Sequence, residues 1–195
     1  MGTHFGGVGM RLLYGTKNHA KLVEGIRELS PLGIEIIGLP DCAPDVSESG
    51  NTPLENAREK ALAYYNAFEC AVFAQDSGLY IENLPDELQP GVHVRRPRGR
   101  YLDDAEMVEY YSALAGHNGD LRARWHDGIC LVVDREHIFD FTYQGRPFII
   151  TAEPHEPLTV GYPLDCLSLA MKDYAAAPTS EWDELREFVK KNLGL

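Results

Sequence analysis

The pattern of hydrophobic and polar positions divides the first half of this chain into alternating strands and helices. Three apolar runs predict strands, at residues 10–14, 34–39 and 70–74. Apolar positions at helical spacing predict a helix over 19–29 and a second helix that begins at Thr52, which forms a capping box with Glu55. Because ligands bind beyond the C-terminal ends of strands in strand–helix–strand units, the polar residues that follow the strands are candidate site residues.

The second half of the chain contains further strands and then helices. Apolar and alternating runs predict strands over 121–133, 137–143 and 146–152. Inside them His126-Asp127 and His137 are isolated polar positions, which is typical of packing or surface residues. Helical spacing predicts helices over 103–115, 164–176 and 180–193. The pattern therefore predicts one α/β domain over residues 1–195, in which 1–9 form a flexible tail or a remnant of an expression tag.

Composition and charge restrict the class of function. The formal net charge of −12 argues against a nucleic-acid polymer as partner, because such polymers need a broad basic surface. No apolar run approaches the roughly 20 residues of a membrane span. The four cysteines are far apart and form no C-x-x-C pair, a usage that fits a reducing cytoplasm. A small anionic ligand stays compatible with this chain if lysines or a divalent cation balance its charge.

Polar residues at both ends of the second predicted helix–strand unit are suited to a metal and to phosphates. Mg²⁺ takes one or two protein carboxylates, so Glu48 and Asp76 are a candidate pair if the helix between them packs back against the strand. A carboxylate here is also able to activate an attacking water. Side chains that suit phosphate oxygens lie nearby, at Lys17, Asn18, Lys21, Asn56 and Lys60. Taken singly, each of these residues also fits an ordinary solvated surface.

One dense basic segment interrupts this acidic chain. Residues 93–100 contain four arginines, among them Arg96. The ordinary interpretation is a solvated loop. The alternative is a segment that holds phosphates or the acidic surface of a partner, because guanidinium groups bind both.

Three motifs follow one another along the first half of the chain. They are Thr16-x-Asn18-x-x-Lys21, then Glu48-x-Gly50-x-Thr52-x-x-Glu55-Asn56-Ala57-x-x-Lys60-Ala61, then Asp76-Ser77-Gly78-Leu79. A shorter match follows, Pro90-Gly91-Val92 with Arg96. By the order and the gaps of these motifs, the sequence resembles the inosine/xanthosine triphosphate pyrophosphatases.

This resemblance implies a fold, an activity and a set of site residues. The fold would be an elongated mixed β-sheet flanked by helices, with two lobes and a cleft, in a homodimer. The activity would be Mg²⁺-dependent hydrolysis of a nucleoside triphosphate to the monophosphate and pyrophosphate. Asp76 would be the general base and a metal ligand, Glu48 the second metal ligand, and Lys21 a phosphate-binding residue of the catalytic centre. The other substrate contacts would be Thr16, Asn18, Asn56, Lys60 and Ser77. Lys17 and Arg96 are further candidates for substrate binding because of their charge.

The sequence departs from the pattern of this family at three places. Gln75 stands where the family usually has an acidic residue, and a neutral side chain weakens a metal site that relies on it. The Gly-Tyr-Asp-Pro motif of the family is matched only in part, by residues 161–165. The Ser-His-Arg motif of the family is absent, and residues 179–182 stand near its position. Because those two motifs carry purine recognition in the family, the sequence predicts an intact phosphate end and an altered base specificity.

Two other functions are compatible with this sequence. Gln75 and the absent C-terminal motifs suggest a nucleotide-binding or interaction protein that has lost turnover. A different phosphoanhydride, such as a modified pyrimidine nucleotide, is the other possible substrate. The retained Lys21, Lys60 and Asp76 favour an active enzyme, because a decayed site would have lost one of them.

Overall fold

One mixed sheet runs through the part of the chain that the computed structural model describes, residues 10–171 and 180–195. Its strand order is β2-β1-β3-β4-β6-β7, and β5 also pairs with β4. β1 is parallel to β2 and β3, whereas β4 is antiparallel to β3, β5 and β6. The strands are β1 Met10–Tyr14, β2 Ile34–Ile37, β3 Val72–Ile81, β4 Leu121–Val132, β5 Ile138–Gln144, β6 Phe148–Ile150 and β7 Ser168–Ala170.

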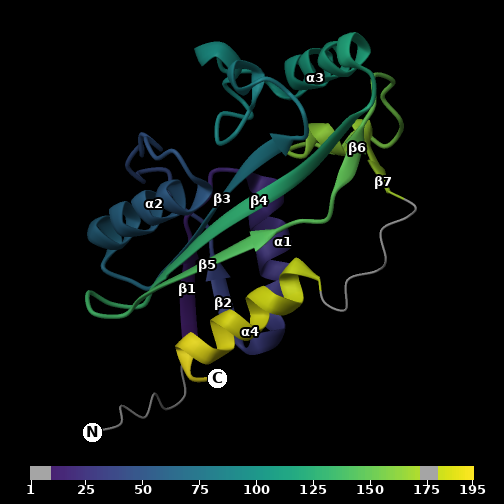
Figure 1. Cartoon of the computed structure of the whole chain (residues 1–195). Helices are drawn as coiled ribbons and strands as arrows, with labels where there is room; N and C mark the ends of the chain where they lie inside the picture. Colours follow the sequence, from purple (N-terminus) through teal and green to yellow (C-terminus); the bar gives the residue numbers. More distant parts are fainter. Residues whose placement is uncertain (1–9, 172–179) are drawn as a thin grey trace, which may run out of the picture.

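Helices cover both faces of the sheet, which confirms the predicted α/β class (Figure 1). They are α1 His19–Leu29, α2 Pro53–Phe68, α3 Asp104–Asn118 and α4 Glu181–Leu193. Ala57 and Ala61 of α2 pack with Ala74, whereas Leu185 of α4 packs with Phe73. Because neighbouring residues of a strand point to opposite faces, α2 lies on one face of β3 and α4 on the other. Leu29 of α1 shares the α4 side.

α3 packs at the far end of the sheet, over a separate hydrophobic cluster. Met107 and Tyr111 of this helix are buried there with Ile81 and Leu167. The two ends of the sheet thus have separate cores, in agreement with the two-lobed arrangement that the resemblance implied. The cleft between the lobes stays a prediction.

The helices begin where their capping residues predicted. Asn18 precedes α1, and its side chain accepts hydrogen bonds from the backbone N–H groups of Ala20 and Lys21. Thr52 and Glu55 form both hydrogen bonds of the capping box of α2, which confirms that prediction. The helices that begin after Asp103 and Ser180 have the same type of box.

The strand predicted over 70–74 is too short. β3 continues through Gln75, Asp76 and Ser77 to Ile81, because β4 pairs with it residue by residue over this whole length. Gly78 lies in the strand beneath α2, where a Cβ would lie 3.1 Å from Pro53 Cγ. Asp76 is therefore held in the middle of a central strand and is not presented on a loop.

The predicted helix over 164–176 is also wrong in its described part. Residues Pro163–Leu167 form a 3₁₀ helix, and Ser168–Ala170 form β7, which pairs with β6. Backbone hydrogen bonds to a neighbouring strand outweigh the helical spacing of the apolar residues here. The rest of that predicted helix lies outside the described residues, as does the predicted tail over 1–9.

No helix of the described residues is both long enough and apolar enough to pass through a membrane.

Candidate active site

β3 distributes the central site residues over its two faces. Asp76 points to the α2 side, and its neighbours Gln75 and Ser77 point to the side of α1 and α4, because side chains alternate along a strand. The sequence motif Asp76-Ser77-Gly78 therefore serves two groups of polar residues.

On the α2 side, two residues of α2 hold the carboxylate of Asp76. Lys60 Nζ lies 2.9 Å from Asp76 Oδ1, and Asn56 Nδ2 donates to Asp76 Oδ2 at 3.0 Å. Asn56 and Lys60 are four residues apart, so one helix face presents both of them. Both side chains are buried, at 2% and 8% exposure. The carboxylate of Asp76 is thus fixed in orientation.

Glu48 reaches the same lysine from the loop before α2. Its Oε1 lies 3.0 Å from Lys60 Nζ, and its backbone is in the left-handed region, with φ of 49°. Side chains of α2 hold this loop, because Ser49 N donates to Glu59 Oε2 at 2.8 Å and Gly50 N donates to Asn56 Oδ1 at 2.8 Å. A left-handed glutamate held in this way is backbone strain, which clusters at functional sites.

The carboxylates of Glu48 and Asp76 therefore converge on one cationic position. Burial alone would lower the pKa of Lys60, but the two carboxylates outweigh burial and raise it. Two carboxylates on a shared cation fit the ligand set of Mg²⁺, which needs one or two of them and takes water and phosphate oxygens besides. In the described residues, no group of three or more His, Cys, Asp or Glu side chains is placed so that it could hold a metal ion.

Arg96 joins this group from the segment that follows β3. Its Nη2 lies 3.6 Å from Glu48 Oε2. The segment is held in place because Leu79 and Gly91 exchange two backbone hydrogen bonds of 2.9 and 3.0 Å. The structure thus brings the predicted residues Glu48, Lys60 and Arg96 together at Asp76.

On the other side of β3, Lys21 begins a short chain of hydrogen bonds. Lys21 Nζ donates to Ser77 Oγ at 2.9 Å, and Ser77 Oγ donates to Asp127 Oδ1 at 2.5 Å. Burial lowers the pKa of Lys21, and the nearby carboxylate of Asp127 opposes this change. Burial also raises the pKa of Asp127, against the opposing influence of Lys21.

Gln75 lies on this side too, away from the Glu48–Asp76 pair. Tyr14 Oη donates to Gln75 Oε1 at 2.9 Å, and Gln75 Nε2 donates to Asp127 Oδ1 and to Glu181 Oε1, each at 3.2 Å. We call Gln75, Asp127 and Glu181 the Gln75 cluster. Gln75 stands where the family usually has an acidic residue. Because its partners all belong to this side of β3, that difference from the family affects the Gln75 cluster and not the Glu48–Asp76 pair.

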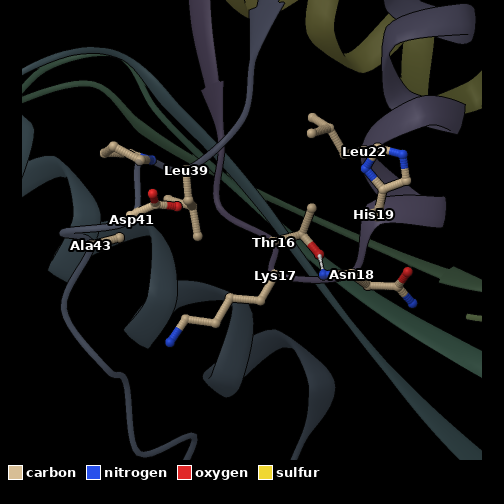
Figure 2. A pocket seen from close by; sticks show the side chains of 9 residues that line it. Thr16, Lys17, Asn18, His19, Leu22, Leu39, Asp41 and Ala43 are labelled. Atoms are coloured by element: carbon tan, nitrogen blue, oxygen red, sulfur yellow. Dashed lines mark hydrogen bonds between the residues drawn. The ribbon is translucent and has the colours of Figure 1, made fainter.

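The loop between β1 and α1 holds the other three predicted residues. Thr16 Oγ1 accepts from the backbone N–H of Asn18 at 3.1 Å, and Asn18 also donates through Nδ2 to the carbonyl of Gly161 at 3.0 Å. Lys17 is exposed and pairs with Asp45. These residues border a cavity of about 340 Å³, and Figure 2 shows that Lys17 extends away from the side chains of Thr16 and Asn18.

The two divergent C-terminal segments meet at α1. Tyr162 Oη donates to Glu24 Oε2 at 2.6 Å, and Trp182 Nε1 donates to Glu24 Oε1 at 3.2 Å. Gly161, with φ of 86°, packs so near α1 that a Cβ would lie 2.9 Å from Asn18 Oδ1. Residues 161–165 and 180–182 are thus neighbours in space, next to residues 16–21.

Sequence reasoning missed Asp127, Glu181 and Gly128. Asp127 was interpreted as a packing or surface residue, and Glu181 as part of an absent motif. Gly128 lies directly opposite Asp76 in β4, where a Cβ would overlap the backbone of α2. A polar residue next to a glycine inside an otherwise apolar strand was the available signal for both β4 positions.

Comparison with known proteins agrees with this arrangement. The chain matches the model of the Ham1 family over residues 12–181. A dITP/XTP pyrophosphatase of Porphyromonas gingivalis is 32% identical over 139 residues, which are 69% of this chain and 70% of that protein. A dITP/XTP pyrophosphatase of Symbiobacterium thermophilum is 43% identical over 86 residues, which are 44% of this chain and 43% of that protein, so the alignment spans less than half of that relative.

A solved structure shows the same fold. The Ham1 protein of Staphylococcus aureus superposes with a TM-score of 0.70 over 93% of this chain and 98% of its own, at 23% identity. Its fold confirms the mixed sheet with flanking helices, and the relatives named above confirm the resemblance seen in the motifs. Since the family model covers most of the sequence and the Porphyromonas gingivalis relative aligns over more than two thirds of both chains, this chain belongs to the Ham1 family.

Proposed function

We propose that this chain hydrolyses a nucleoside triphosphate to the monophosphate and pyrophosphate. The observation that carries the proposal is the convergence of Glu48, Lys60 and Asp76, which come from a loop, a helix and a strand and meet within 3.0 Å. The relatives named dITP/XTP pyrophosphatase support the same reaction. An inactive binding protein is the weaker candidate, because Gln75 does not contact this group.

Asp76 is the general base of the proposed reaction. Asn56 orients its carboxylate through the 3.0 Å hydrogen bond to Oδ2, so that a carboxylate oxygen is directed at a water. The water oxygen forms a new bond to phosphorus, the anhydride bond between the α and β phosphates breaks, and Asp76 takes up a proton of the water. Pyrophosphate leaves with the bridging oxygen. Positioned general bases contribute about 10²- to 10⁴-fold to such rates.

Cationic and polar side chains around Asp76 bind the phosphates. Lys60 and Lys21 approach β3 from opposite faces, and Arg96 lies beside Glu48. They balance the charge of the triphosphate in a protein whose net charge is otherwise −12. The residues proposed to contact substrate are Thr16, Lys17, Asn18, Lys21, Asn56, Lys60, Ser77 and Arg96.

Glu48 and Asp76 would hold the Mg²⁺ ion that the reaction uses. Their fit is the convergence of both carboxylates on the position of one cation, Lys60 Nζ. When bound, Mg²⁺ neutralises phosphate charge and polarises a phosphoryl group. Glu48 is held for this purpose by the contacts of its loop with α2.

We propose that base specificity differs from that of the inosine/xanthosine triphosphate pyrophosphatases. Residues 161–165 and 180–182, where the family motifs for the base are altered, are joined through Glu24. An acidic side chain, Glu181, and an indole, Trp182, stand where the family has histidine and arginine. Such a change alters the hydrogen bonds that are available to a base, so a modified pyrimidine is among the candidate substrates.

We expect the enzyme to act in the cytoplasm as a homodimer. The cysteine usage motivates the first expectation and the family resemblance motivates the second. Size-exclusion chromatography with light scattering measures the mass directly, and a mass near that of one 21.8 kDa chain would remove the dimer from the proposal.

The proposal is tested by turnover of a nucleotide panel with Mg²⁺. The panel contains dITP, XTP, ITP, the common dNTPs and modified pyrimidine triphosphates, and both pyrophosphate and orthophosphate are measured. We expect pyrophosphate from at least one member. Release of orthophosphate alone would show a different cleavage.

Asp76→Asn and Asp120→Asn form the matched pair of variants. Asp120 is an exposed residue directly before β4, eight positions before Gly128, the partner of Asp76, so its variant is expected to keep full activity. Asp76→Asn is expected to lose at least about 100-fold in kcat. Tight nucleotide binding without turnover by the unaltered protein would favour the inactive binding protein instead.

A further inference from the structure

The Gln75 cluster is connected to Lys21 through the hydroxyl of Ser77, and none of its residues is among those proposed to contact substrate. Asp127 accepts one hydrogen bond from Ser77 and another from Gln75, at the same oxygen Oδ1. Lys21 in turn donates to Ser77. Glu181, the first residue of α4, is joined to Asp127 through the amide of Gln75. The C-terminal helix therefore contributes a carboxyl group to the surroundings of Lys21.

On the basis of the proposed function, we propose that Glu181 is a positioning residue that controls the charge beside Lys21. Through Gln75 and Asp127 it keeps the Lys21 ammonium in place, and by holding a proton at neutral pH it keeps a second negative charge away from the bound triphosphate.

The hydrogen bonds give Gln75 one orientation. Its Oε1 accepts from the hydroxyl of Tyr14, while its Nε2 donates to two carboxyl oxygens. Reversing the amide would place a carbonyl oxygen against both carboxyl groups, which is unfavourable. A fixed Gln75 therefore fixes the position of Asp127 Oδ1. This oxygen accepts the hydroxyl proton of Ser77, so the lone pairs of Ser77 Oγ remain available to accept the hydrogen bond from Lys21.

The charges of the cluster agree with this role. Burial, followed by the carboxylate of Asp127, raises the pKa of Glu181 to about 8. At neutral pH Glu181 is thus mainly uncharged, so it adds no negative charge beside Asp127 and Lys21. Above pH 8 the cluster carries a second negative charge, which repels an anionic ligand held by Lys21.

Other ionisable groups face Glu181 from the neighbouring elements. They are Tyr14 on β1, Lys21 and Glu24 on α1, Asp127 on β4, Tyr143 on β5 and Tyr162 before the 3₁₀ helix Pro163–Leu167. Burial raises the pKa values of all three tyrosines, so they stay neutral over the same range. Lys21 is the other group whose titration would weaken phosphate binding as the pH rises. Its contribution must be separated from that of Glu181.

Glu181→Gln separates the two contributions. The amide oxygen of glutamine can still accept from Gln75, but it cannot ionise. The measurement is calorimetric binding of the non-hydrolysable analogue α,β-methylene ITP with Mg²⁺, from pH 7.0 to 9.5. The unaltered protein is expected to lose roughly tenfold in affinity around pH 8, as one added charge near a phosphate implies. Glu181→Gln is expected to lose this decrease in affinity around pH 8 and to keep only the decrease that comes from Lys21.

Glu187→Gln is the control, because Glu187 is exposed on the same helix and pairs with Lys190 on the surface. Glu187→Gln is expected to show the same loss of affinity around pH 8 as the unaltered protein. Titration of the nucleotide itself affects all three proteins equally and cancels in their ratio. Carbon-13 NMR of labelled glutamate carboxyls gives a second, independent readout, in which one resonance titrates near pH 8 and is absent from Glu181→Gln.

Each outcome decides between the two proposals. A loss of affinity around pH 8 that persists in Glu181→Gln, or a Glu181 carboxyl that titrates near its ordinary pKa, would overturn the role of Glu181 while the pyrophosphatase activity stands. No binding of the analogue together with no turnover in the nucleotide panel would overturn the proposed function and, with it, this inference. Absence of this loss of affinity in Glu181→Gln alone supports both.

Discussion

Gly128 of β4 lies so close to Leu54 at the start of α2 that a Cβ at position 128 would overlap the backbone of Leu54. In the sheet register Gly128 is also the direct partner of Asp76. The missing side chain therefore lets the first turn of α2 rest on the sheet beside the proposed base. This contact sets the height at which Asn56 and Lys60 meet Asp76.

Gly128→Ala is expected to destabilise the fold by about 2–3 kcal/mol, because the clash is with backbone and cannot be relieved by a side-chain rotation. For a domain of this size that is roughly 5–10 °C in Tm. We also expect turnover to fall by more than the loss of folded protein explains, since α2 must move away from Asp76. Thermal unfolding by circular dichroism and turnover below Tm measure the two effects.

Gly116→Ala is the control for this prediction. Gly116 lies inside α3, and a Cβ there would meet only Ala152 Cβ, at 3.8 Å. Alanine is the better helix former, so this variant is expected to be more stable by about 0.5–1 kcal/mol. Equal Tm values for Gly128→Ala and the unaltered protein would show that α2 is not held by this contact.

The pairing of Asn56 and Lys60 with Asp76 could be predicted from local signals. Both residues lie on one face of a helix with a clear start, and the helix precedes the strand that carries Asp76. The separation of Asp76 from Ser77 could not be predicted, because Gly78 is typical of a turn and only pairing with β4 keeps β3 extended. The contacts of Gln75 with Asp127 and Glu181 span 52 and 106 residues, distances over which no periodicity acts.

Lys60→Met tests the metal pair without relying on activity. The substitution removes the ammonium shared by the carboxylates of Glu48 and Asp76 and leaves only Arg96, at 3.6 Å from Glu48, as a nearby cation. Because Glu48 is about one third exposed, we expect a smaller loss than the roughly 3–5 kcal/mol of a fully buried broken pair, about 2 kcal/mol. MgCl₂ is expected to recover part of this loss, since the ion would occupy the position of the ammonium. Tm with and without MgCl₂ is the measurement.

Lys190→Met is the matched lysine substitution on the surface, where Lys190 pairs with Glu187. It is expected to change the free energy of unfolding by less than about 0.5 kcal/mol, with no specific response to MgCl₂. If Mg²⁺ raised the Tm of both variants equally, Glu48 and Asp76 would not be the ligands.

Exchanging the side chains at positions 75 and 181 tests whether they form one unit. Gln75→Glu places a third carboxyl group against Asp127 and Glu181, and we expect it to lower the free energy of unfolding by about 2–3 kcal/mol at pH 8. Adding Glu181→Gln returns the number of carboxyl groups to two and gives the new carboxyl group at position 75 an amide donor, although that carboxyl group still faces Asp127. The double variant is therefore expected to regain part of the stability that Gln75→Glu loses.

A double-mutant cycle in urea quantifies this coupling at fixed pH. A coupling above about 1 kcal/mol shows direct interaction of the two side chains. Additive effects of the two substitutions would mean that α4 does not dock its first residue against β3. Such a result would also remove the structural basis for a role of Glu181.

Glu181 also gives the folded state a defined dependence on pH. Its pKa in the folded protein is about 8, against an ordinary value of 4.5, so between these values the folded chain keeps a proton that the unfolded chain has lost. The free energy of unfolding therefore falls as the pH rises from about 4.5 to 8, and this contribution is constant above 8. Glu181→Gln removes this contribution. After a discount for the partial exposure of Glu181, we expect the variant to be more stable than the unaltered protein by on the order of 2 kcal/mol at pH 8.5. The difference is expected to shrink toward pH 5. Urea unfolding at several pH values measures this difference in the free energy of unfolding. The control Glu187→Gln changes an exposed carboxyl on the same helix and should show no such trend. A difference between Glu181→Gln and the unaltered protein that does not vary with pH would show that Glu181 is ionised at neutral pH.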